Sequence, residues 1–91
     1  MVIGVEIMLS VNVVFFASLK EIIGQDSCII KLELPVSIGQ LKQKLANELK
    51  NGQALLDGNI QSSVDFEFTR DTDMISESVK EIAFFPPVTG G

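Results

Sequence analysis

The chain has 91 residues, of which 46% are hydrophobic and 21% charged, so it is able to bury the modest core of one domain and is not an intrinsically disordered chain. Seven basic and twelve acidic residues give a net charge of −5, and the scattered basic residues argue against binding of a nucleic-acid backbone. The sequence has no histidine and a single cysteine, Cys28, which excludes a Cys/His metal site, histidine-based catalysis and an internal disulfide.

The first 17 residues are mostly apolar, yet they lack a basic leading segment and contain Glu6 and Asn12. They therefore predict a strand with a leader rather than a signal peptide or a membrane span. Without an export signal, and with one reduced thiol, we expect a cytoplasmic protein that has no membrane partner.

Two strands joined by a short helical turn are expected next. Residues 11–17 alternate in hydrophobicity, with Val13 and Phe15 on one face and Val14 and Phe16 on the other. Residues 18–23 favour a short helical turn that stops at Gly24. A second strand over 28–34 follows, and the two strands are predicted to pair as a hairpin.

The clearest element is a helix that begins after Ser37. Ser37 and Gln40 have the spacing of a capping box, in which two side chains satisfy backbone donors at the start of a helix. Leucines and one isoleucine recur at helical spacing up to residue 49, and Gly52 is the expected stop. One apolar stripe predicts a helix lying across a sheet, and the three lysines on the helix are expected to face solvent: Lys42, Lys44 and Lys50.

The last third of the chain predicts more strands. Residues 63–69 alternate cleanly, with Val64, Phe66 and Phe68 on one face, and residues 74–75 suggest a brief strand. The final strand is expected over 81–85. Two strands, a helix and further strands predict an α+β domain with one main helix packed on one face of a mixed sheet.

The final residues have their own chemistry. Pro86 and Pro87 cannot donate ladder hydrogen bonds, so residues 86–91 are expected to leave the domain as an extended tail. The sequence ends in Gly90 and Gly91, and glycine lets the walls of a partner close around the backbone without crowding the terminal carboxylate. Such an ending favours chemistry at the carboxyl terminus, although Gly-rich chain ends are also often only frayed.

The string IAFFPPVTGG, at residues 82–91, closely resembles the carboxyl end of the small subunit of molybdopterin synthase, and VNVVFFASLKE resembles that family's first strand and turn. The resemblance implies a ubiquitin-like β-grasp fold with the last strand beside the first. It divides the chain into an N-terminal extension over 1–10, a β-grasp domain over 11–85 and a tail over 86–91. For residues 1–10, a misplaced start with Met8 as the true first residue and a genuine extra strand remain alternatives.

The resemblance also implies a mechanism. An ATP-dependent adenylating enzyme would activate the Gly91 carboxylate, and a sulfur donor would convert it into a thiocarboxylate that donates sulfur to a pterin precursor, forming the molybdopterin dithiolene. The tail residues that deliver it would be Pro86, Pro87, Val88, Thr89 and Gly90. The chain itself would bind no cofactor, because ATP is used by the activating enzyme.

The main partner implied is the large subunit of molybdopterin synthase, in a heterotetramer, and the catalytic side chains are expected on that subunit. Adjacent phenylalanines on a strand face opposite ways, so Phe16 and Phe85 are expected on the outer face of the sheet, as a docking surface. Phe68 aligns with an interface position of the family, although its alternation alone would suit a core. The alternative is that loops or residues 1–10 cover this face.

Other residues carry weaker signals. Asp71, Asp73 and Glu77 lack the spacing of a calcium loop, and we expect no metal site. Cys28 is interpreted as a small core residue. Asp65 is interpreted as part of a solvated strand face, and the family commonly has asparagine at this position. Three rival functions remain: a sulfur carrier for thiazole or tRNA thiolation, a ubiquitin-like protein modifier, and a plain interaction module that merely ends in glycine.

Overall fold

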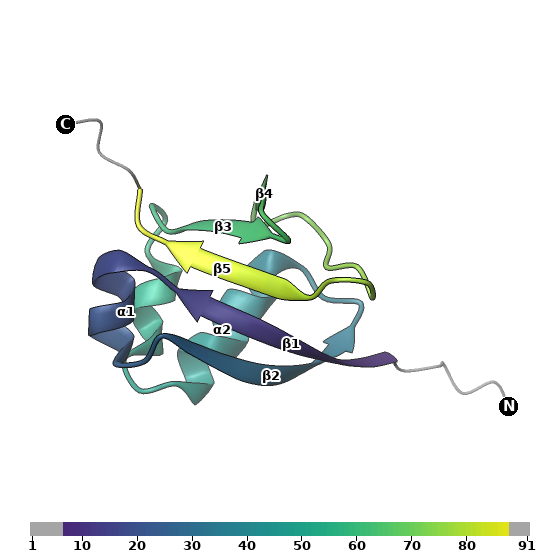
Figure 1. Cartoon of the computed structure of the whole chain (residues 1–91), viewed down its shortest axis with the longest axis horizontal. Helices are drawn as coiled ribbons and strands as arrows, with labels where there is room; N and C mark the ends of the chain where they lie inside the picture. Colours follow the sequence, from purple (N-terminus) through teal and green to yellow (C-terminus); the bar gives the residue numbers. More distant parts are fainter. Residues whose placement is uncertain (1–6, 88–91) are drawn as a thin grey trace, which may run out of the picture.

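The computed structural model describes residues 7–87, and Figure 1 shows a five-stranded sheet with helices packed against it. The strands are β1 (Ile7–Phe15), β2 (Ser27–Leu34), β3 (Gln61–Val64), β4 (Glu67–Thr69) and β5 (Glu81–Phe85). The helices are α1 (Ala17–Ile23), α2 (Ile38–Glu48) and a 3-10 helix, η1 (Gly52–Leu56).

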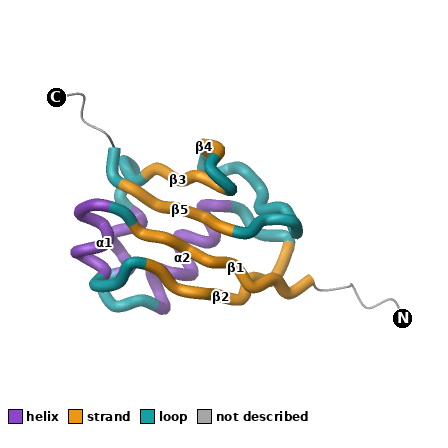
Figure 2. Tube along the Cα trace, viewed as in Figure 1, coloured by secondary structure: helices purple, strands orange, loops and turns teal. Residues whose placement is uncertain are grey.

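The sheet has the order β2-β1-β5-β3-β4 and is mixed. β1 pairs antiparallel with β2 and parallel with β5, so the last strand lies beside the first, as the family resemblance implied. Helices cover one face of the sheet, with α2 lying across it (Figure 2). The α+β prediction of one main helix on a mixed sheet is confirmed.

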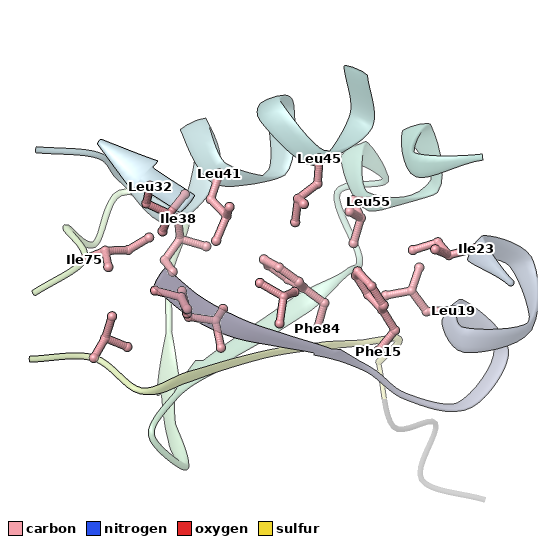
Figure 3. Close-up of a cluster of buried hydrophobic side chains, with 14 residues drawn as sticks. Phe15, Leu19, Ile23, Leu32, Ile38, Leu41, Leu45, Leu55, Ile75 and Phe84 are labelled. Carbon is pink, nitrogen blue, oxygen red and sulfur yellow. The ribbon is translucent and has the colours of Figure 1, made fainter. Parts of the chain in front are cut away.

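The core lies between α2 and the sheet. Phe15 and Phe84, adjacent in the β1–β5 register, stack with ring centroids 6.4 Å apart beneath the leucines of α2 (Figure 3). Leu41 and Leu45 of α2 and Leu55 of η1 are fully buried against them. The helical stripe read from the sequence is therefore the stripe that closes the core.

The start of α2 matches the capping-box prediction. Ser37 Oγ accepts a hydrogen bond from the Gln40 amide at 3.1 Å, and Gln40 Oε1 accepts one from the Ser37 amide at 2.8 Å. The end differs from expectation, because the last helical residue is Glu48 and Gly52 opens η1. A Cβ at Gly52 would collide with the Leu45 carbonyl oxygen, so the glycine permits η1 to pack against α2.

The prediction of a single strand over 63–69 is wrong. β3 ends at Val64, and Asp65 and Phe66 form a two-residue turn with φ of 46° and 73° before β4 begins. Two successive positive φ values are the signature of a tight hairpin turn. Val64 consequently lies opposite Ile82 on the core face, whereas Phe68 lies opposite Ser63 on the other face.

β1 is longer than expected at its start. Ile7 to Ser10 pair with Leu34 to Lys31 of β2, so the boundary proposed at residue 10 falls inside β1. The brief strand expected over 74–75 is an isolated bridge between Met74 and Ser37. Residues 1–6 lie outside the described part of the chain, and so does most of the expected extension.

Lys42 was expected on the solvated side of α2, but its residue is only 4% exposed. Its Nζ donates to the Ile60 carbonyl at 3.0 Å and lies 2.7 Å from an Asp71 carboxylate oxygen. The lysine therefore ties α2 to the turns on either side of the β3–β4 hairpin. Lys44 and Lys50 are exposed as predicted.

Candidate functional site

β5 delivers the chain to the edge of the domain where the expected tail begins. Pro86 is half-buried against the body and Pro87 is exposed, so the chain leaves the sheet directly after Phe85. The missing amide hydrogens of the two prolines prevent the ladder from continuing. The other tail residues of the prediction lie outside the described residues: Val88, Thr89, Gly90 and Gly91.

A pair of aromatic rings lies on the open face of the sheet, next to this exit. Phe68 is 78% exposed, and its ring meets that of half-buried Phe85 edge to face, with centroids 5.8 Å apart at 64°. The strand register explains the contact, since Phe68 lies opposite Ser63 and Phe85 opposite Gln61 on the same face of β3. The structure thus brings together two of the three predicted interface residues.

Phe16 is the third residue, and it is half exposed at the end of β1. It occupies the N-cap of α1 without making a side-chain cap hydrogen bond, although Ser, Thr, Asp or Asn is preferred there. Its amide donates to the Phe84 carbonyl at 3.1 Å, which fixes it beside the end of β5. A phenyl group at this position adds no capping hydrogen bond to the helix, and about half of its surface is open to solvent.

The open face carries further apolar surface: Val14, which was predicted on the face of Phe16, and Ile29, which the sequence analysis did not single out. Ile29 of β2 is 76% exposed and lies opposite Asn12 of β1. Val14 of β1 pairs with Ser27 of β2 on one side and with Ala83 of β5 on the other. Alternation would have placed Ile29 on this face, because its neighbour Ile30 packs against the core. Phe66, at 88% exposed, lies at the hairpin tip and was assigned to the wrong element.

Asp65 also has a role that its reading as a solvated strand residue missed. Its Oδ1 accepts hydrogen bonds from the backbone amides of Lys80 at 3.1 Å and Glu81 at 2.9 Å. The carboxylate therefore ties the β3–β4 turn to the first residue of β5. By fixing the start of β5, it helps to fix the strand that carries the tail.

Cys28 and the acidic residues Asp71 and Asp73 make contacts that stabilise the fold. Cys28 is half-buried beside the core, and burial, followed by the Glu48 carboxylate, raises the pKa of its thiol, which disfavours the nucleophilic thiolate. The Asp73 carboxylate accepts from the Arg70 amide at 2.8 Å, and Asp71 pairs with Lys42. None of the helices within residues 7–87 is long and apolar enough to cross a membrane.

Comparison with known proteins decides the family. Residues 13–91 match the family model described as ThiS family. The chain belongs to the ThiS family. This ThiS-family chain is 32% identical to the molybdopterin synthase sulfur carrier subunit of Escherichia coli, over 89% of this chain and 99% of the relative. It is 35% identical to the subunit of the same name from Dictyostelium discoideum, over 88% of this chain and 94% of the relative.

Solved structures agree with the fold of this ThiS-family chain. A putative molybdopterin converting factor subunit 1 from Pyrococcus furiosus superposes with a TM-score of 0.71 at 16% identity, covering 88% of this chain and 99% of that one. Small archaeal modifier protein 1 of Haloferax volcanii gives 0.68 at 18%, with the same coverage. A complex of subunits 1 and 2 of the molybdopterin-converting factor of Helicobacter pylori gives 0.61 at 22%, covering 93% and 100%. The fold is the ubiquitin-like β-grasp fold.

Proposed function

We propose that this protein is the sulfur-carrier subunit of a molybdopterin synthase. The observation that carries the proposal is the 32–35% identity to two sulfur carrier subunits of that enzyme over nearly their whole lengths. The contact between exposed Phe68 and half-buried Phe85, beside the exit of the tail, supports it, because a carrier must dock before its terminus is used. The working group is the carboxylate of Gly91.

The first step is activation of that carboxylate. An α-carboxyl group has an ordinary pKa of about 3.5, so it is ionised at neutral pH and able to attack the α-phosphate of ATP. The reaction forms an acyl-adenylate and releases pyrophosphate. A sulfur donor then delivers hydrosulfide-level sulfur to the terminal carbonyl carbon, AMP leaves, and the terminus becomes a thiocarboxylate. The adenylating enzyme supplies the ATP site, and this chain binds no cofactor in the cycle.

The second step is delivery of sulfur to the pterin precursor. The large subunit of the synthase takes up the tail, and Phe16, Phe68 and Phe85 form the docking surface that holds the domain against it. Docking converts a bimolecular attack into a positioned one, for which effective molarities reach about 10⁵ M or more. Acid, base and oxyanion groups come from the large subunit, so this chain is a sulfur-donating subunit rather than the catalyst. In each transfer the sulfur bonds to a carbon of the pterin precursor, water cleaves its bond to the Gly91 carbonyl carbon, and the carboxylate is restored; two transfers build the dithiolene.

The assembly that fits this scheme is a heterotetramer of two carriers and two large subunits in the cytoplasm. The pairing of subunits 1 and 2 in the Helicobacter pylori complex supports a large-subunit partner. The archaeal modifier has a similar fold at low identity, and it motivates protein modification as the alternative. A sulfur carrier for thiazole or tRNA thiolation is the other alternative.

Intact-mass measurement separates these functions. After incubation with the adenylating enzyme, ATP and a sulfur donor, the carrier gains about 16 Da, the difference between sulfur and oxygen. A persulfide on Cys28 would add about 32 Da instead, so a C28S variant serves as the control. The charged protein, mixed with the large subunit and the pterin precursor, then returns to its starting mass as molybdopterin forms. An isopeptide adduct on other proteins, with no mass gain of the free chain, would contradict the proposal.

A further inference from the structure

A hollow of about 250 Å³ lies at the base of the tail, apart from the phenylalanine surface. Its walls come from α1, η1, the segment before β3 and the tail itself. The apolar part of the lining consists of Leu19, Ile22, Ala54, Ile60, Pro86 and Pro87. A cavity of about 150 Å³ already accommodates a benzene-sized group, so the hollow has room for a leucine or phenylalanine side chain.

The base of the tail lies between this hollow and the phenylalanine surface. Pro86 and Pro87 line the hollow, while the preceding residue, Phe85, turns its ring to Phe68 on the open face. The hollow and the aromatic pair are therefore both within reach of a partner that takes up the chain beyond Pro87.

We propose that the hollow receives an apolar side chain of the large subunit, so that the tail base is held from two sides. This inference rests on the proposed function. Ile22, at 49% exposed, is apolar surface that such a contact would bury. Burial of an aliphatic side chain is favourable by about 1.5 to 3 kcal/mol, and contacts of this kind form the desolvated centres of interfaces.

The polar rim of the hollow indicates what surrounds that side chain. Ser18, Asp57 and Asn59 complete the lining, and Asp57 Oδ1 accepts the Asn59 amide at 2.9 Å, which holds the carboxylate at the rim. With a net charge of −5 on this chain, the complementary partner surface is an apolar anchor flanked by basic residues. Contacts on both sides fix the direction in which the chain leaves Pro87, and so the position of the terminal atom.

The test is the affinity of the uncharged carrier for the large subunit, measured by titration calorimetry. Ile22→Asp places a charge at the hollow, and the expected result is a Kd at least tenfold higher. Met74→Asp is the matched control, because Met74 is 60% exposed, bridges to Ser37 at the start of α2 and does not line the hollow. Its Kd is expected to stay within twofold of the wild type.

A second variant covers the case in which Ile22→Asp unfolds the short helix α1. Ser18→Phe extends a ring over the hollow from an exposed position and is expected to raise the Kd similarly. Wild-type affinity of either folded variant would overturn the inference. So would a loss confined to thiocarboxylation by the adenylating enzyme with normal binding of the large subunit. Failure of the unmodified wild-type protein to bind any large subunit would refute the proposed function itself.

Discussion

Phe68 shows how one side chain can be well placed for docking while contributing little to the fold. It lies on β4, one of the two edge strands, and more than three quarters of its surface faces solvent. Its only described aromatic partner, within residues 7–87, is Phe85. The apolar surface that it exposes is therefore available to a partner.

Phe68→Ala tests this assignment. We expect a Kd for the large subunit at least tenfold higher, in keeping with the loss of an aromatic anchor worth about 2 kcal/mol. The free energy of unfolding should change by less than about 1 kcal/mol, because most of the side chain is already solvated. Met74→Ala is the control for removal of an exposed apolar side chain. Binding by Phe68→Ala with wild-type affinity would remove the residue from the docking surface.

Lys42 provides a contrast at the same scale, since its charge lies inside the protein. Lys42→Met keeps the aliphatic stem but removes the contacts with Asp71 and the Ile60 carbonyl. We expect a loss of about 2 kcal/mol in the free energy of unfolding, typical of a charged hydrogen bond lost at a buried site. Lys44→Met removes an exposed pair with Glu48 at 2.8 Å and should cost about 0.5 kcal/mol or less. Equal losses in urea denaturation of the two variants would contradict the structural role of Lys42.

At the scale of elements, the sequence predicted the helix and strand boundaries that are set by nearby side chains. The capping box located the start of α2, and Pro86 located the end of β5, because side-chain chemistry fixes each boundary nearby. Gly24 ends α1 with φ of 87°, as expected for a left-handed cap. Lys42 escaped prediction because its two partners come from distant turns, which no local pattern reveals.

The β3–β4 hairpin was not predicted from the sequence, for a different reason. A tight turn with two positive φ values normally announces itself as Asn-Gly or Asp-Gly, but this chain has Asp65-Phe66. The phenylalanine extended the alternation of residues 63–69 and concealed the turn. The same misreading placed Val64 and Phe68 on one face, although the hairpin puts them on opposite faces.

Phe66→Gly tests the turn directly. A non-glycine residue in the left-handed region costs about 1 kcal/mol or more, whereas glycine adopts it without strain. The extra freedom of glycine in the unfolded chain offsets part of the gain, so we expect stabilisation of up to about 1 kcal/mol. Phe68→Gly, within β4, should instead destabilise. Thermal and urea unfolding of the two variants measure the difference, and destabilisation by Phe66→Gly would contradict the observed turn.

At the scale of the whole molecule, the proposed function gives the domain and the tail separate roles. Within residues 7–87, the buried core between α2 and the sheet includes Phe84 but neither of the described tail residues, Pro86 and Pro87. Asp65, the β1–β5 ladder and Pro86 fix where the chain leaves the domain. Stability should therefore belong to the domain, while reactivity belongs to the last residue. The sequence predicted this division from Pro-Pro and Gly-Gly, but the docking surface also needed the register of the strands.

Deletion of Gly91 tests whether folding and sulfur transfer depend on different parts of the chain. Because Gly91 lies beyond the ladder and both prolines, the shortened protein should unfold at the same urea concentration as the wild type, and it should bind the large subunit with a Kd within about threefold. Molybdopterin formation should fall at least a hundredfold, since a terminus about 3.5 Å short misplaces the reacting atom. Addition of one alanine after Gly91 is the matched control, because it displaces the terminus in the other direction and should be equally inactive. Full activity of either folded variant would show that the terminal carboxylate of Gly91 is not the sulfur-carrying group.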